Sequence, residues 1–242
     1  PEHPRSNLAS MGIYIFNWKT LKEALITMAN QPALDFGKHV IPYCHDKGAP
    51  LYAYEFTGYW KDVGTLSSYW EANMELIDIV PEFNLYEEYW KIYTRSEIQP
   101  PQYFSGDSVV ERSIIGEGTD IYGKVYNSVI GCGVTIGKGT VVRDSIIMNQ
   151  TQIGESCELY KAIVAENVTI GNRVRLGIGE EAPNDTAPHI YNHGIVTIGE
   201  KSIIPDGITV GKNTVIFGET TDKDYENSYF ASGKSLIKAG EQ

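Results

Sequence analysis

Residues 59–65, YWKDVGT, are the stretch of the sequence best suited to chemistry, because one carboxylate, Asp62, stands there among aromatic residues and glycines. In an extended segment Trp60 and Asp62 project to the same side, so a ring and a carboxylate can face one ligand. Gly58 and Gly64 permit close approach of the backbone. Mg²⁺ favours one or two carboxylates together with phosphate oxygens, which makes Asp62 a candidate magnesium ligand.

The same spacing also allows a purely structural interpretation of this segment. An Asp shortly before Gly-Thr at the start of a helix is often a helix cap. Aromatic residues near the end of a strand often belong to the core. From spacing alone, both interpretations of Asp62 stay open.

The elements that must position Asp62 have α/β character. Residues 11–16 (MGIYIF) and 51–56 (LYAYEF) are predicted strands. Ligands of open α/β sheets bind beyond the carboxyl ends of strands, which is where residues 59–65 follow the second predicted strand. A doubly wound sheet needs about twice as many strands, so we expect part of this domain to lie before Pro1.

Two amphipathic helices are predicted beside these strands. The first begins after Asn17, whose side chain is a suitable N-cap. The second is capped by Thr65 or Ser67, and its apolar residues recur on one face from Leu66 to Ile77.

From about residue 108 to 218 the sequence becomes repetitive. Aliphatic residues recur most often at steps of six, and a small or medium-sized residue usually stands two positions before each. This pattern predicts a triangular parallel β-helix with three short strands per coil. Similarity to hexapeptide solenoids implies that the coil is left-handed, and residues 177–194 interrupt the repeat as a predicted loop. The aliphatic positions are Ile115, Ile121, Ile130, Ile136, Val142, Ile147, Ile153, Leu159, Val164, Ile170, Leu176, Ile198, Ile204, Val210 and Ile216.

Composition excludes several classes of function. The chain has 242 residues and a net charge of −11, which argues against a nucleic-acid partner because a backbone-binding surface needs clustered Lys and Arg. No run approaches the roughly 18 apolar residues of a membrane span. Three cysteines without metal-ligand spacing predict neither a disulfide framework nor a zinc site, and a cytoplasmic location is the simplest expectation.

Four motifs carry a resemblance to a known family: NLASMGIYIF (7–16), DFGKHVIP (35–42), YWKDVGT (59–65) and WEANMELI (70–77). Followed by a hexapeptide solenoid, they closely resemble the glucose-1-phosphate adenylyltransferases, the ADP-glucose pyrophosphorylases of glycogen and starch synthesis. The resemblance implies a nucleotidyltransferase that makes ADP-glucose and pyrophosphate from ATP and glucose 1-phosphate.

The resemblance also implies roles for single residues. Asp62 matches one of two acids that hold the catalytic Mg²⁺ in this family. Five residues match positions that line the glucose 1-phosphate pocket, where hydroxyls, a carboxylate and aromatic rings can contact a sugar. The structural alternatives are strand packing for Ser10 and Tyr14 and helix capping for Asp35. The five residues are Ser10, Tyr14, Asp35, Phe36 and Trp60.

The same comparison implies a domain organisation. Residues 1–80 match the C-terminal part of the catalytic domain, 81–107 a linker, 108–218 the left-handed β-helix and 219–242 a tail that caps it. The family's Gly-rich nucleotide loop and its first metal-binding acid would precede Pro1, so we expect half an active site and no activity from this chain alone. The family is typically tetrameric and allosteric, which predicts a homotetramer or a heterotetramer with a paralogous subunit.

Two other functions compete with this interpretation. A non-catalytic regulatory subunit would keep the fold and lose catalytic residues, whereas Asp62 is intact. A hexapeptide acyltransferase would use a histidine base, and His189 and His193 lie in the predicted corner loop. The α/β segment has no explanation in an acyltransferase.

Overall fold

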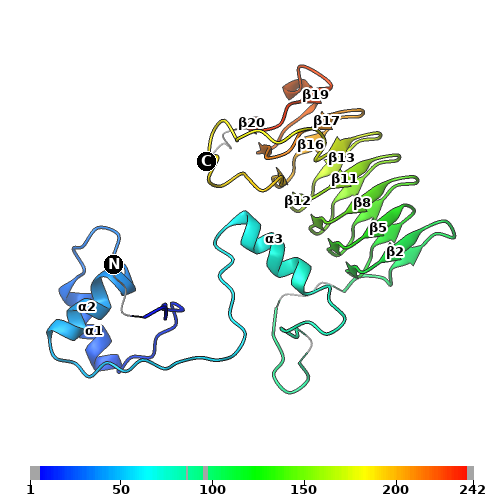
Figure 1. Ribbon diagram of the computed structural model, residues 1–242. Helices are drawn as coiled ribbons and strands as arrows, with labels where there is room; N and C mark the ends of the chain where they lie inside the picture. Colours follow the sequence, from blue (N-terminus) through cyan, green and yellow to red (C-terminus); the bar gives the residue numbers. More distant parts are fainter. Residues whose placement is uncertain (1–5, 86, 95–97, 239–242) are drawn as a thin grey trace. The chain divides into compact units, whose positions relative to one another are not determined.

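The computed structural model describes residues 6–85, 87–94 and 98–238. These residues divide into two compact units, with the boundary between Trp60 and Lys61. The first unit contains the helices α1 (Trp18–Thr27) and α2 (Ile41–Asp46) and the π-helix η1 (Phe36–Val40) (Figure 1). In the described ranges, no helix has the length and apolar character that crossing a membrane requires.

The first unit has a small core at which its helices meet. Ala24 of α1, Val40 of η1 and Cys44 of α2 are buried together. Asn17 caps α1 by accepting a hydrogen bond from the backbone N–H of Lys19, as predicted.

The prediction of two strands in this unit is wrong. Residues 11–16 and 51–56 form no strand, and neither segment pairs with another within the described residues. Ile15 is fully exposed and Tyr52 is 92% exposed. A strand is stabilised by ladder hydrogen bonds and cross-strand side-chain contacts, so an alternating pattern without a partner leaves its apolar residues in solvent.

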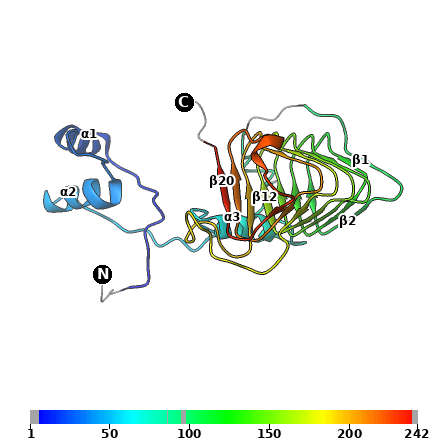
Figure 2. The same ribbon diagram turned by 90° about the horizontal axis from the view of Figure 1, so that it is seen from above.

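The second unit is dominated by a parallel β-helix, whose coils are stacked along one axis (Figures 1 and 2). Successive coils pair in register, so that Ile153 lies between Ile136 and Ile170 in one sheet. The predicted aliphatic positions form one continuous core, with Ile115 packed against its edge. The prediction of a triangular parallel β-helix is confirmed.

Three sheets form the sides of the coil. The first contains β1 (Tyr103–Phe104), β4 (Asp120–Ile121), β7 (Thr135–Ile136), β10 (Gln152–Ile153), β13 (Thr169–Ile170) and β16 (Ile203–Ile204). The second contains β2 (Val109–Glu111), β5 (Lys124–Tyr126), β8 (Val141–Arg143), β11 (Glu158–Tyr160), β14 (Arg175–Leu176), β17 (Thr209–Val210) and β19 (Tyr229–Phe230). The third contains β3 (Ile114–Ile115), β6 (Val129–Ile130), β9 (Ile146–Ile147), β12 (Ala162–Val164), β15 (Val196–Ile198), β18 (Val215–Phe217) and β20 (Ser235–Ile237).

The small residues before the aliphatic positions tie one coil to the next. The Thr140 hydroxyl donates to the carbonyl of Gly154 at 2.6 Å, and the Cys157 thiol donates to that of Gly171 at 3.0 Å. These side chains are buried, and each satisfies its polar atom on a neighbouring coil. This explains why a polar but small residue recurs inside an apolar core.

The solenoid extends beyond the predicted range of 108–218 at both ends. Strand β1 lies in the predicted linker, and β19 and β20 continue two sheets within the predicted tail. Phe230 and Leu236 keep the six-residue step and pack on the core. The repeat was obscured because the 3₁₀ helix η2 (Asp222–Asp224) interrupts the spacing between β18 and β19.

Helix α3 (Leu66–Glu75) packs on the outer face of the third sheet. Leu66, Tyr69, Trp70 and Met74 contact a patch of buried isoleucines, Ile146, Ile163 and Ile195. The helical face was predicted, but its partner was not, because amphipathic spacing does not indicate which surface covers the apolar side.

Candidate active site

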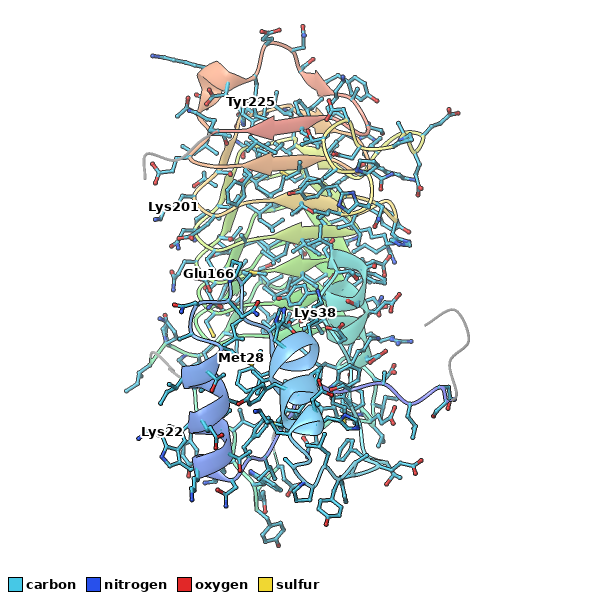
Figure 3. All side chains as sticks on the ribbon, turned by 90° about the vertical axis from the view of Figure 1, so that its left-hand side faces the viewer. Lys22, Met28, Lys38, Glu166, Lys201 and Tyr225 are labelled. Carbon is cyan, nitrogen blue, oxygen red and sulfur yellow. The ribbon has the colours of Figure 1, made fainter. Side chains whose placement is uncertain are left out.

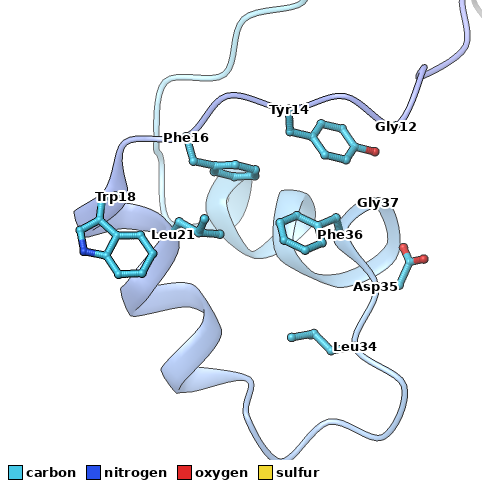
Figure 4. A pocket seen from close by; sticks show the side chains of 9 residues that line it. All are labelled: Gly12, Tyr14, Phe16, Trp18, Leu21, Leu34, Asp35, Phe36 and Gly37. Carbon is cyan, nitrogen blue, oxygen red and sulfur yellow. The ribbon is translucent and has the colours of Figure 1, made fainter. Parts of the chain in front are cut away.

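Four of the predicted site residues come together in the first unit. The Tyr14 hydroxyl lies 3.0 Å from the Ser10 hydroxyl, and the Tyr14 ring stacks on Phe36 with ring centres 6.0 Å apart. Asp35 precedes Phe36 at the start of η1. An open pocket of about 760 Å³ lies here (Figure 4), within the range of small-molecule sites. Its lining consists of Gly12, Tyr14, Phe16, Trp18, Leu21, Leu34, Asp35, Phe36 and Gly37.

Asp35 is a helix cap as well as a pocket residue. Its Oδ1 accepts a hydrogen bond from the backbone N–H of Lys38 at 2.6 Å, and its own N–H donates to Nδ1 of His39 at 3.0 Å. The capping alternative for Asp35 is therefore observed. It leaves the second carboxylate oxygen available in principle to a ligand, because a carboxylate has about four acceptor sites.

Gly37 lies where the polar groups of the pocket converge. A Cβ at this position would lie 3.4 Å from Oδ1 of Asp35 and 3.8 Å from the hydroxyl of Tyr14. The glycine of the DFG motif therefore keeps open a space that a carboxylate and a phenol both border. Phe16, which packs edge-on against Phe36 at 5.9 Å, also lines the pocket and was not predicted. Its position two residues after Tyr14 was the available signal.

The segment around Asp62 has a turn of its own. Oδ1 of Asp62 accepts a hydrogen bond from the N–H of Gly64 at 3.0 Å, and the residue is exposed. Thr65, rather than Asp62, caps α3, in a capping box with Ser68. The helix-cap interpretation of Asp62 is therefore wrong. Trp60 is the last residue of the first unit, is 46% exposed and does not line the pocket described above.

Asp62 has the donor chemistry of a magnesium ligand. Among the described residues, no group of three or more His, Cys, Asp or Glu side chains could hold a metal ion. An exposed carboxylate of this kind suits Mg²⁺, which binds few protein groups and completes its coordination with phosphate oxygens and water.

Lys61 is a residue of this segment that the sequence did not single out. Its Nζ lies 2.5 Å from Oε1 of Glu75 and 3.5 Å from Oε2 of Glu71, both on α3. The hydrogen bond to Glu75 is the largest influence on the pKa of Lys61 and raises it above its usual value. The signal available in the sequence was the pair of glutamates four residues apart on the predicted helix.

The two histidines considered for acyl transfer are surface residues. His189 and His193 are both exposed in the loop between β14 and β15. The loop is attached to the last coils through Asn184, which is buried and donates to the carbonyl of Asn213 at 3.0 Å.

Comparison with known proteins agrees with this arrangement. Residues 1–79 match the nucleotidyl transferase family, and residues 102–198 match the GlmU-like C-terminal hexapeptide family. The chain is therefore a nucleotidyltransferase segment followed by a left-handed β-helix.

The relatives narrow this class. Glucose-1-phosphate adenylyltransferases from Lachnospira eligens and Acetivibrio thermocellus are 63% and 48% identical over the whole chain. The one from Thermotoga maritima is 48% identical over 98% of it. The chain spans 57% of the length of each of these relatives. Its similarity to glucose-1-phosphate adenylyltransferases extends over essentially the whole chain, as the motifs predicted.

Proposed function

We propose that the protein containing this chain transfers an adenylyl group from ATP to glucose 1-phosphate, forming ADP-glucose and pyrophosphate. The observation that carries the proposal is a pocket lined by Tyr14, Asp35 and Phe36, with the Ser10 hydroxyl 3.0 Å from that of Tyr14. The chain that holds this pocket is similar over its whole length to enzymes of that name. In the reaction, a phosphate oxygen of glucose 1-phosphate attacks the α-phosphorus of ATP. The bond to the departing pyrophosphate breaks at the same centre.

The pocket is suited to the sugar of glucose 1-phosphate. The hydroxyls of Ser10 and Tyr14 and the carboxylate of Asp35 can exchange hydrogen bonds with sugar hydroxyls. The stacked rings of Tyr14 and Phe36 offer an apolar surface for the pyranose ring. Trp60 does not line this pocket, and it is proposed as a further sugar contact on the resemblance alone. These residues bind and orient the substrate, which supplies much of the rate enhancement when little covalent chemistry is asked of the protein.

Asp62 is the residue of this chain that would hold Mg²⁺. When bound, the ion would neutralise charge on the reacting phosphates. The turn at Gly64 supports this role, because it engages Oδ1 of Asp62 on an exposed surface segment. A Cβ at position 64 would lie 3.1 Å from the same oxygen, so glycine lets the carboxylate fold back onto the backbone.

The proposal includes the setting of the enzyme. From the family we expect a tetramer, formed by this subunit alone or together with a paralogue. We also expect regulation by allosteric effectors and a cytoplasmic location, in glycogen or starch synthesis. Free thiols at Cys44, Cys132 and Cys157 are consistent with a reducing compartment.

The test is pyrophosphate release by the full-length protein from ATP, Mg²⁺ and glucose 1-phosphate. We expect turnover in the wild type and a loss of two or more orders of magnitude in Asp62→Asn, with an unchanged circular dichroism spectrum. Near-normal turnover of Asp62→Asn at saturating Mg²⁺ would sink the role of Asp62. The 242-residue chain alone is expected to be inactive, and ADP-glucose formation by it would refute that expectation.

A regulatory subunit without activity of its own is the second candidate. It is favoured only if the full-length wild type fails to release pyrophosphate while stimulating a catalytic paralogue. The intact Asp62 weighs against it. Acetyl-CoA turnover, expected to be absent, separates both from an acyltransferase.

A further inference from the structure

Lys61 joins the segment of Asp62 to the body of the second unit. Its ammonium reaches two carboxylates of α3, Glu71 and Glu75, and its side chain is only 22% exposed. A surface lysine that serves only solubility needs no fixed partner, whereas the ammonium of Lys61 contacts two carboxylates. The contacts link the residue before Asp62 to α3.

The helix that Lys61 grips is itself anchored to the solenoid. Trp70 donates from its indole Nε1 to the carbonyl of Asp144 at 2.7 Å, and the ammonium of Lys161 lies 5.0 Å from the centre of the Trp70 ring. Beyond the helix, Asp78 pairs with Arg112 at 3.2 Å. Both Asp144 and Lys161 occupy a corner of the coil in left-handed backbone conformation, with φ of 51° and 50°. Helix α3 is therefore attached to the solenoid by a hydrogen bond and a cation–π contact of Trp70.

Asp62 is bracketed by these attachments. On one side Lys61 is bound to α3, and on the other Thr65 begins α3 through its capping box with Ser68. Between them, the carboxylate is turned back onto the N–H of Gly64. A carboxylate in a segment attached at both ends to one helix has little freedom to drift.

We propose that Lys61 is a positioning residue, which holds Asp62 against α3 so that the solenoid, through Trp70 and α3, sets the orientation of the catalytic carboxylate. The inference rests on the proposed function. Exposed ion pairs contribute little to stability, so loss of Lys61 need not unfold the protein. Catalytic groups, by contrast, must be held within about 0.5 Å of their productive geometry.

The test compares Lys61→Met with wild type in the full-length protein, measuring kcat, the KM for glucose 1-phosphate, the Mg²⁺ concentration for half-maximal rate, and Tm. We expect kcat to fall roughly tenfold or more and the half-maximal Mg²⁺ concentration to rise severalfold. The KM for glucose 1-phosphate and Tm should change little. Lys61→Arg, which keeps the charge and reach, should restore most of kcat.

Lys234→Met is the matched control, because Lys234 forms an ion pair with Asp185 at 3.4 Å in the last coils. It should leave kcat and the Mg²⁺ requirement as in wild type. A double-mutant cycle with Glu75→Gln adds a second measurement. If the two residues act together, Lys61→Met combined with Glu75→Gln should lose no more kcat than the worse single variant.

The outcomes separate the inference from the proposed function. An inactive wild type removes the proposed function, and the inference with it. An active wild type with unchanged kcat and Mg²⁺ requirement in Lys61→Met overturns the inference alone. If Lys61→Met lowers Tm more than Lys234→Met does, Lys61→Arg distinguishes a positioning role from a purely structural one. Restored Tm without restored kcat overturns the inference, and restoration of both together with the Mg²⁺ requirement supports it.

Discussion

The indole Nε1 of Trp70 donates a hydrogen bond of 2.7 Å to the backbone carbonyl of Asp144, across 74 residues of sequence. This bond joins α3 to a corner of the solenoid that Asn127 also braces, by donating to Oδ1 of Asp144 at 2.6 Å. The helix that follows the YWKDVGT motif is thus structurally part of the β-helix unit.

Trp70→Phe should therefore destabilise the second unit. The variant loses a hydrogen bond and leaves the carbonyl of Asp144 without its indole partner, and it weakens the contact with Lys161. We expect a loss of about 1–3 kcal/mol in the free energy of unfolding, measured by urea denaturation. Trp90→Phe is the control, since Trp90 is 83% exposed. Equal stability of the two variants would contradict the anchoring role.

Tyr14→Phe should weaken sugar binding without disturbing the fold. The variant keeps the ring that stacks on Phe36 and removes the hydroxyl that meets Ser10. One lost hydrogen bond of about 1 kcal/mol predicts a KM for glucose 1-phosphate about fivefold higher in the full-length protein. The KM for ATP should stay unchanged. A larger rise in the KM for ATP than in the KM for glucose 1-phosphate would contradict the assignment of this pocket to the sugar phosphate.

Gly37→Ala tests the same pocket by filling it. The added methyl would lie at ordinary contact distance from Asp35 and Tyr14, so the fold should tolerate it. Because it occupies the space between the carboxylate and the phenol, we expect a rise in the KM for glucose 1-phosphate and a Tm within a few degrees of wild type. An unchanged KM would show that the substrate does not enter this space.

Tyr225 should make the end of the solenoid sensitive to alkali. The side chain is packed on the core at the last coil (Figure 3), and burial raises its pKa to about 12. The folded state thus keeps the phenol protonated to higher pH than the unfolded chain, whose pKa is about 10. The contribution of Tyr225 to stability is full below about pH 10 and is lost as pH rises through about 12.

Tyr225→Phe removes the titrating group, so Tm should fall less steeply between about pH 10 and 12 than in wild type. Tyr229→Phe, at an exposed phenol of the same coil, is the control and should follow the wild-type profile. Parallel profiles of wild type and Tyr225→Phe would contradict the prediction. Differential scanning fluorimetry across this range is sufficient.

Cys157 should be replaceable by threonine. The equivalent position one coil earlier is Thr140, whose hydroxyl bonds a carbonyl of the next coil as the Cys157 thiol does. We expect Cys157→Thr to change the unfolding free energy by less than about 1 kcal/mol. Cys157→Leu should cost about 1–3 kcal/mol through overpacking of the buried site. Urea denaturation of both variants checks the difference, and equal stability would be inconsistent with a tightly packed core.

Local chemistry alone determined much of this protein. Six-residue steps located the inner side chains of the β-helix, because a short strand and a corner repeat identically in every coil. Asn17 and Thr65 indicated the starts of α1 and α3, since capping involves neighbours within a few residues. The motifs around Tyr14, Asp35 and Asp62 indicated the family. Phe230 and Leu236 follow the six-residue step, but the residues of η2 interrupt the spacing before them, so the repeat was not recognised there.

Long-range contacts decided the rest. The alternating residues 11–16 and 51–56 resemble strands, yet a strand needs a partner, and the described residues supply none. The ion pairs of Lys61 with Glu71 and Glu75 depend on the folded helix α3, which places both glutamates on one face. The packing of α3 on Ile146 and Ile163 could be seen only in the folded solenoid. The apolar face of a helix predicts that this face is buried, but only the tertiary structure shows which surface buries it.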